Sequence, residues 1–331
     1  MSHKINRRQF TAAAAAAAAT TAFGGLPGAQ AQGVGTYPSQ PIRLVVPYPA
    51  GGATDTLGRM MAAKLQEAWG QTLVVENKPG ASGTVGNDLV AKAPPDGYTV
   101  LLGITAIVQV PALMSKLPYD VLKDLKPLTQ VASTNSVLVV PPSTPARTLA
   151  EFIALVKANP GKYNYGSYGV GTSSHIHGSL LNLQAGTDLV HVPYKGAAPL
   201  LQDLRGGQLS AAFIDMATVS PHLASLKVLA ATGAGRNKNL PDTPSFAELG
   251  FHSFEPEGWF GLFMPAAVPA PIAQKFADEC NRILRLPDVI SKIETLGMKP
   301  GGMKSEEFAR IVHADLTLYA KIIKDTRISL E

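Results

Sequence analysis

Three glycine-rich turns, each between an apolar β-like run and an amphipathic helix pattern, constrain the fold of this chain most strongly. They lie within residues 42–55, 73–86 and 165–175. Strands that alternate with helices in this way are typical of an α/β fold. A helix start leaves backbone N–H groups unpaired and carries partial positive charge, and glycine lets a small anion approach them closely. One such turn is an ordinary strand–helix connection, whereas three together predict a cradle for a small anionic or polar ligand.

Two extended segments, residues 131–140 and 254–264, look like connections between domains. If the chain crosses twice, its C-terminal helices return to the first domain, and the first two glycine turns face the third across a cleft. We therefore predict two lobes. Residues 32–137 together with 257–331 form the first lobe, and residues 138–256 form the second.

Residues 1–31 have the features of an export signal. A basic start precedes an uncharged stretch with eight consecutive alanines, and an A-x-A cleavage site ends at Ala31. The arginine pair Arg7-Arg8 leaves Sec and twin-arginine export both open. The apolar stretch is too short for a membrane span, and no cysteine follows it to carry a lipid. We expect a periplasmic protein that begins near Gln32 and has no stable membrane anchor.

Composition and missing motifs disfavour several other functions. The signal holds three of the 29 basic residues and none of the 24 acidic ones, which leaves a mature net charge of +2. No Lys/Arg-rich run is present, so we expect no nucleic-acid partner. No Walker A, G-x-G-x-x-G or G-x-S-x-G motif occurs, and we expect no cofactor. His175 and His177 would diverge by about 200° on a helix, which disfavours a metal site. Cys280 lies on an apolar helix face and is expected to be a buried thiol.

Four polar residues lie near the predicted cradle, and each has a structural alternative. Asp55 either stabilises the first turn of its helix or accepts hydrogen bonds from a ligand or a bridging water. His175 either points at a ligand or caps its helix. Asp215 follows an apolar strand, so it either lines a crevice or ends the strand in a plain turn. Lys195 either attracts an anion or is simply solvated.

A set of short motifs along the whole mature chain is similar to one known family. The motifs are residues 37–38, 41–43, 47–52 with Asp55, 75–83 with Gly86, 95–99, 191–196, 204–207 and 243–250. In this combination the chain resembles the Bug family, the periplasmic solute receptors of tripartite tricarboxylate transporters. The resemblance implies a type II, two-lobed "Venus flytrap" α/β fold. It also implies a cleft that holds a carboxylate or carboxamide through backbone amides and ordered waters.

The resemblance also implies which residues bind the ligand. Ser82 stands where relatives often carry glycine or alanine, which leaves the local pocket shape open. The candidate ligand-binding residues are Tyr48, Ala50, Gly51, Gly52, Asp55, Ser82, Gly83, Thr84, Thr105, Ser167, Gly169, Thr172, His175 and Asp215.

The leading functional hypothesis is a monomeric, non-enzymatic receptor that delivers a small carboxylate or carboxamide to the membrane permease of such a transporter. The alternative is a periplasmic ligand sensor that docks on a membrane sensor kinase, because a receptor and a sensor would share all these residues. An enzyme is disfavoured because no nucleophile–base pair can be assembled from the motifs.

Overall fold

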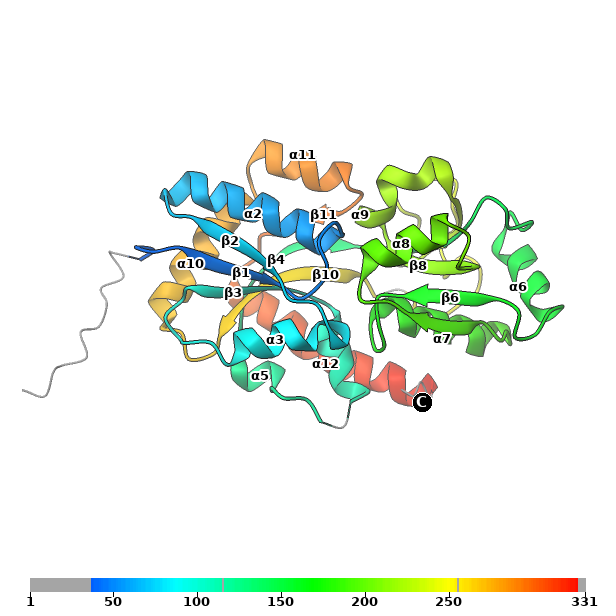
Figure 1. Cartoon of the computed structure of the whole chain (residues 1–331), viewed down its shortest axis with the longest axis horizontal. Helices are drawn as coiled ribbons and strands as arrows, with labels where there is room; N and C mark the ends of the chain where they lie inside the picture. Colours follow the sequence, from blue (N-terminus) through cyan, green and yellow to red (C-terminus); the bar gives the residue numbers. More distant parts are fainter. Residues whose placement is uncertain (1–36, 115, 255, 327–331) are drawn as a thin grey trace, which may run out of the picture. The chain divides into compact units, whose positions relative to one another are not determined.

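Two β-sheets with helices on both faces organise the chain from Pro38 onward (Figure 1). The computed structural model describes residues 37–114, 116–254 and 256–326. The chain divides into two units, residues 1–37 and 38–331, and all that follows concerns the second. The predicted export signal of residues 1–31 lies outside the described residues. The predicted α/β fold with two lobes is confirmed.

The first sheet has six strands in the order β11-β4-β10-β3-β1-β2. Strand β1 runs parallel to β2 and β3, whereas β10 runs antiparallel to β3 and β4, as β11 does to β4. The strands are β1 (Ile42–Val46), β2 (Leu73–Asn77), β3 (Thr99–Ile104), β4 (Leu125–Thr134), β10 (Gly258–Pro265) and β11 (Lys299–Pro300).

Helices cover both faces of the first sheet because alternate strand residues point to opposite sides. A Cβ on Gly58 of α2 would lie 3.0 Å from Val46 and 3.8 Å from Leu44. The intervening Val45 belongs instead to the core that Val312 of α12 shares. The helices are α2 (Ala53–Trp69), α3 (Thr84–Ala91), α4 (Ala106–Gln109), α5 (Val121–Asp124), α10 (Ala270–Ile283), α11 (Pro287–Thr295) and α12 (Ser305–Thr326), with 3-10 turns η2 (Ala81–Gly83) and η3 (Val110–Ala112).

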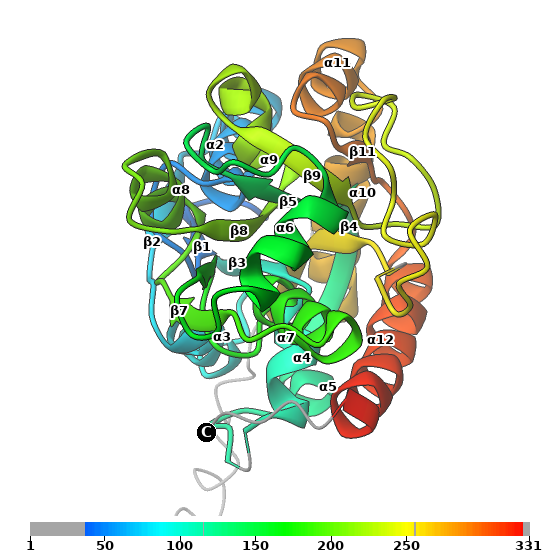
Figure 2. The same cartoon turned by 90° about the vertical axis from the view of Figure 1, so that its right-hand side faces the viewer.

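The second sheet has five strands in the order β7-β6-β8-β5-β9 and separates two cores, of which one continues into the core of the first sheet and the other is smaller. Leu138 and Phe213 face the core that contains Phe152 of α6, whereas Val139 and Ile214 face the core of α8. Figure 2 shows this sheet between α8 on one side and α6 and α7 on the other. The elements are β5 (Ser136–Val140), β6 (Asn164–Ser167), β7 (Val190–Pro193), β8 (Ala211–Asp215), β9 (Lys227–Ala231), α6 (Leu149–Lys157), α7 (Ser173–Ala185), α8 (Ala197–Arg205), α9 (Met216–Val219) and η4 (Ser220–Ser225).

The chain passes between the sheets at two places. At Asn135 it leaves β4 for β5, so Ser136 already belongs to the second sheet, and it returns between Ala231 and Gly258. The two passages are bonded to each other, because the Asn135 side-chain amide donates to the carbonyl of Thr232. The first sheet is therefore built from both ends of the unit, and the second from its middle.

Several helix ends follow local residue preferences, and the predicted burial of the cysteine is confirmed. Gly70 and Gly186 end α2 and α7 in the left-handed conformation that glycine favours. Thr148 caps α6 by accepting a hydrogen bond from the Glu151 N–H at 3.2 Å. Cys280 is buried in α10, and burial raises the pKa of its thiol.

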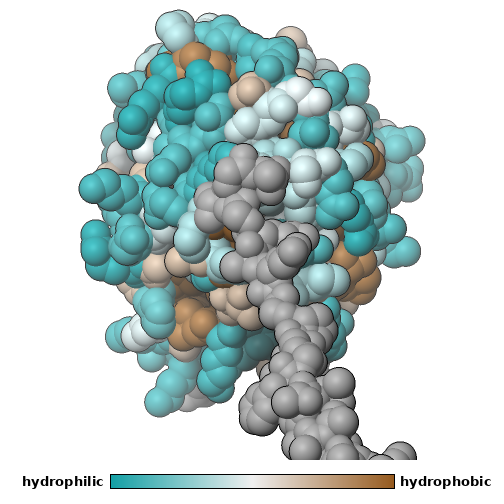
Figure 3. Space-filling model, turned by 90° about the vertical axis from the view of Figure 1, so that its left-hand side faces the viewer, coloured by the Kyte–Doolittle hydropathy of each residue, from teal (hydrophilic) through white to brown (hydrophobic). Residues whose placement is uncertain are grey.

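The outer surface differs from these cores. The end of the unit on the left of Figure 1 is mostly hydrophilic, with apolar residues only in scattered small groups (Figure 3). Within the part of the chain that the structure describes, no helix has the length and apolarity needed to cross a bilayer.

Candidate ligand-binding site

A cavity of about 60 Å³ lies between the two sheets, where β1 and β3 of the first sheet and β6 and β8 of the second reach their carboxyl ends. Crevices at such strand ends are the usual ligand sites of open α/β sheets. Residues from both sheets line it, including the strand ends that flank the two passages. They are Tyr48, Pro49, Gly52, Ala53, Thr54, Ile104, Thr105, Thr134, Ser136, Tyr168, Thr172, Ser173, Ala197, Asp215, Gly258, Trp259 and Phe260.

Three helices of eight or more residues begin at this cavity. Ala53 opens α2, Ser173 opens α7, and Ala197 opens α8, and all three residues line the cavity. A Cβ on Gly52 would lie 3.6 Å from the Cβ of Ala197, so two of these helix starts face each other closely across the lobes. The first turn of a helix presents N–H groups without intrahelical partners. The cavity therefore combines several sources of partial positive charge without a basic side chain.

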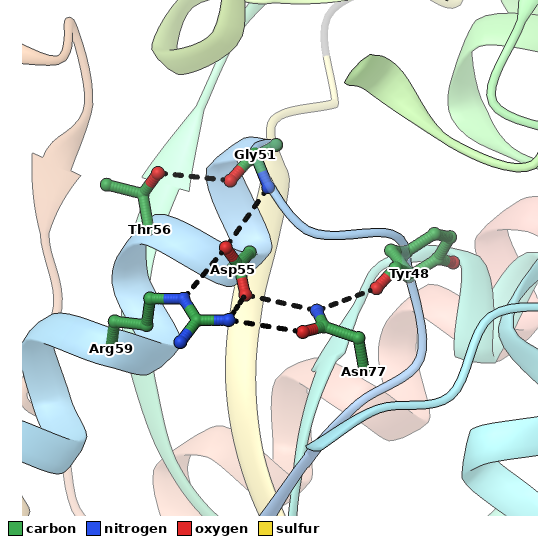
Figure 4. Close-up of polar contacts among 7 residues, drawn as sticks. Tyr48, Gly51, Asp55, Thr56, Arg59 and Asn77 are labelled. Carbon is green, nitrogen blue, oxygen red and sulfur yellow. Dashed lines mark hydrogen bonds and ion pairs between the residues drawn. The ribbon is translucent and has the colours of Figure 1, made fainter. Parts of the chain in front are cut away.

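Asp55 does not line the cavity, because its carboxylate turns back onto the first glycine turn (Figure 4). It accepts hydrogen bonds from Gly51 N at 3.1 Å, Arg59 Nε at 3.0 Å and Asn77 Nδ2 at 3.0 Å. The Asn77 amide also donates to the carbonyl oxygen of Tyr48 at 3.0 Å. Asp55 and Asn77 thus hold both ends of the turn that carries Gly52 into the cavity.

The surroundings of Asp55 favour its charged form. Burial raises the pKa of this carboxyl, but the hydrogen bonds from Arg59, Gly51 and Asn77 outweigh burial and hold the pKa below its usual value. The Arg59 side chain is 55% exposed, so its ion pair with Asp55 is partly screened by water. Of the two roles weighed for Asp55 from the sequence, these contacts supply the structural one, and hydrogen bonding to a ligand or a bridging water stays a prediction.

The second glycine turn packs behind the cavity and does not line it. Tyr48 Oη donates to the Ser82 carbonyl at 3.0 Å, and a Cβ on Gly83 would lie 2.8 Å from that hydroxyl. Ser82 has a φ of 55°, which is unusual for a residue other than glycine. Its hydroxyl donates to the carbonyl of Val170 at 2.5 Å and so joins the two lobes.

The third turn sends Thr172 into the cavity and is braced from behind by the buried His175 and the half-buried His191. The Ser167 hydroxyl lies 2.6 Å from Nε2 of His191, and Nδ1 of His175 accepts the Gly171 N–H at 3.1 Å. The two imidazole rings stack with centroids 4.2 Å apart. Burial lowers the pKa of both histidines to about 4, so both rings are neutral near pH 7. The neutral ring of His175 keeps the lone pair that receives the Gly171 N–H.

Asp215 lines the cavity and is bound by three donors. Its carboxylate accepts from Tyr168 Oη at 2.6 Å, Thr218 N at 2.9 Å and Thr218 Oγ1 at 3.0 Å. The Tyr168 hydroxyl in turn accepts the Asp215 N–H at 2.6 Å. Burial raises the pKa of Asp215, and the bonds from Tyr168 and Thr218 act against that rise.

The first residues of β10, directly after the second passage, supply the apolar wall. Trp259 and Phe260 of β10 line the cavity beside Thr105. Thr105 Oγ1 accepts the Trp259 N–H at 2.7 Å, and the indole N–H of Trp259 donates to Asp315 at 2.7 Å. The wall is therefore fixed from both sides by hydrogen bonds.

Five of the residues predicted from the sequence line the cavity, together with several that were not predicted. Tyr168 lies inside the third turn, and Ala197 follows Gly196 in a fourth glycine–helix junction, so both had a usable sequence signal. Tyr48, Gly52, Thr105, Thr172 and Asp215 line the cavity, whereas Ala50, Gly51, Asp55, Ser82, Gly83, Thr84, Ser167, Gly169 and His175 lie outside its lining.

Two α/β lobes with a cavity at the facing strand ends define the class of bilobal solute-binding proteins. A family model described as "Tripartite tricarboxylate transporter family receptor" matches residues 57–328. The chain belongs to this family of receptors, as the resemblance to the Bug proteins indicated. It is a family of periplasmic binding proteins and not of enzymes.

Solved structures of relatives are similar over nearly the whole unit. The periplasmic binding protein BugD is 30% identical with a TM-score of 0.85, and the match covers 88% of this chain and 99% of that one. An R. palustris protein with adipate is 31% identical with a TM-score of 0.85, over 88% and 99% of the two chains. MatC from Rhodopseudomonas palustris with bound malate is 29% identical with a TM-score of 0.82, over 87% and 100%.

Proposed function

We propose that this protein captures a small carboxylate or carboxamide between its two lobes and delivers it, chemically unchanged, to the membrane permease of a tripartite tricarboxylate-type transporter. One observation carries the proposal. The cavity at the strand ends is lined from both sheets and receives the first residues of α2, α7 and α8. Adipate and malate in the relatives' structures support an acid as the ligand.

We assign two roles to the candidate site residues. Those that line the cavity touch the ligand or its waters, mainly through backbone N–H groups. Those outside it hold the turns in place, as Asp55 does for the first turn. We further propose that the boundaries between the two lobes lie near residues 137 and 257. Export should remove the segment up to about Ala31, and the mature protein should act as a monomer.

Catalysis is not part of the proposal. Within the described residues around the cavity, the arrangement most like a nucleophile with its base is Ser167 with His191 at 2.6 Å. Ser167 is fully buried and does not line the cavity, so a ligand there does not reach its hydroxyl. A nucleophile must reach its substrate, which supports a binding role alone.

A thermal-shift screen with small mono-, di- and tricarboxylates and their amides tests the proposal. A ligand at about 100 times its dissociation constant stabilises the folded state by about 2.7 kcal/mol. At about 2–4 °C per kcal/mol, a binding acid should raise the melting temperature by roughly 5–10 °C. The same acid should be recovered unchanged after hours with the protein.

A matched pair of variants locates the ligand. Gly52→Val projects a side chain from the cavity lining, and its Cβ would meet only Ala197 at the ordinary distance of 3.6 Å. Gly235→Val makes the same change where nothing lies within 4 Å. The melting shift should disappear in Gly52→Val and persist in Gly235→Val. If both variants keep it, the ligand binds elsewhere.

A further inference from the structure

The cavity is chemically one-sided. Its described lining contains one carboxyl group, that of Asp215, and no lysine, arginine or histidine. The basic side chain near the first turn, Arg59, is 55% exposed and pairs with Asp55. Lys195 lies outside the lining. Attraction for an anion at the described lining therefore comes from helix starts, backbone N–H groups and hydroxyl groups, without a basic side chain.

Burial raises the pKa of Asp215, and the donors around its carboxylate act to keep it charged. Three donor groups, two from Thr218 and the Tyr168 hydroxyl, point at its carboxylate. Burial and the charge of Asp215 raise the pKa of Tyr168 well above its usual value, so this hydroxyl keeps its proton and donates it. A carboxylate offers about four acceptor positions. Three are used within the protein, which leaves one for a donor on a ligand.

The small volume of the cavity places the Asp215 carboxylate close to the helix starts. A cavity of about 60 Å³ admits only a small ligand. Both of its ends then lie within several ångströms of Asp215 or of the helix starts. A second negative group on such a ligand would meet the Asp215 charge in a buried setting where repulsion is poorly screened.

We propose that the site selects a small monocarboxylate whose other end donates a hydrogen bond, as an amide or an ammonium group, to Asp215, and that it discriminates against dicarboxylates. This inference rests on the proposed function and narrows it. It separates this chain from the relatives whose structures hold adipate and malate, which both carry two carboxyl groups.

Calorimetry with matched ligand pairs tests the inference. Succinate and succinamate differ only in one carboxylate against one amide, and so do glutarate and glutaramate. Aminobutyrate adds an ammonium end. The monoamides or the amino acid should bind about tenfold to a hundredfold more tightly than the diacids of equal length, as expected for one unscreened like-charge contact.

Variants assign the preference to Asp215. Asp215→Asn keeps the shape and should reduce the difference between monoamide and diacid to less than about threefold. Asp203→Asn is the matched control, because Asp203 also accepts from a tyrosine hydroxyl, Tyr194 Oη at 2.7 Å, but lies outside the cavity lining. If Asp215→Asn does not fold, Asp215→Ser serves instead. It removes the same charge, keeps a side-chain oxygen that can accept the Thr218 N–H, and should likewise reduce the preference.

The outcomes separate the two proposals. Diacids that bind the wild type as tightly as monoamides overturn the inference and leave the receptor function standing. An unchanged preference in Asp215→Asn or Asp215→Ser also overturns it. If no member of either series binds, the receptor function fails and the inference with it.

Discussion

Asp55 offers the sharpest test of how the first glycine turn is held. Asp55→Ala removes the acceptor of the Gly51 N–H and of the Asn77 amide, and it breaks the ion pair with Arg59. Each of the two hydrogen bonds is worth about 1 kcal/mol. The ion pair adds less than about 1 kcal/mol because the Arg59 side chain is 55% exposed. The free energy of unfolding should therefore fall by roughly 2–3 kcal/mol.

The same substitution should weaken binding, although Asp55 lies outside the cavity lining. Without it the turn that presents the N–H groups of Gly52 and Ala53 loses its brace. We expect the affinity to fall about fivefold, which corresponds to about 1 kcal/mol of binding free energy. Calorimetry measures the affinity, and the melting temperature should fall by roughly 5–10 °C.

Arg59→Ala is the control for this prediction. It removes the ion pair and the 3.3 Å bond to Asn77 but leaves Asp55 on the turn. Its stability should fall by less than about 1 kcal/mol, with affinity unchanged within twofold. Two results would refute the bracing role: Asp55→Ala with wild-type affinity, or Arg59→Ala with an affinity loss as large as that of Asp55→Ala.

Three further predictions concern the bond between Ser82 and Val170, the buried His177 and the packing at Gly178. Ser82→Ala loses the bond to Val170 across the lobes and should lower ligand affinity about fivefold by calorimetry. Unchanged affinity would show that this bond does not help to hold the lobes together around the ligand. His177 has a pKa of about 4, below its unfolded value of about 6.5. The free energy of unfolding is unaffected by this group above pH 6.5 and falls as the pH falls towards 4, because the unfolded state then binds a proton that the folded state does not. In His177→Phe, the free energy of unfolding measured in urea should change with pH less steeply over this range, by up to about 1.4 kcal/mol per pH unit. Gly178→Ala places a Cβ 2.0 Å from the Tyr165 ring and should cost about 1–3 kcal/mol or more in the same assay.

The fold was readable from the sequence because its signals are local. The apolar run of residues 42–46, the turn after it and the helix that Gly70 ends all follow from backbone and burial preferences within a few residues. The pairing of β10 between β3 and β4 joins segments more than 120 residues apart. Periodicity does not specify such a pairing, and only the two crossing segments hinted at it.

The site was readable in part for the same reason. Glycine turns mark where backbone approaches a ligand, and Asp215 marks a strand end. Which side of a turn faces the cavity depends on partners far along the chain. Asp55 turns away because Asn77, 22 residues later, binds it. Ser82 turns to Val170, 88 residues away, and Trp259 reaches the cavity from β10. None of these partners is encoded in local spacing.

Solution X-ray scattering tests most directly whether one ligand is held between two lobes. The acid that raises the melting temperature most is titrated into the wild type while the radius of gyration is followed. A ligand that contacts both lobes, as proposed, should favour the form in which Ser82 bonds to Val170. The radius of gyration should fall and level off at one ligand per chain. Calorimetric binding at one ligand per chain with an unchanged radius of gyration would contradict capture between the lobes.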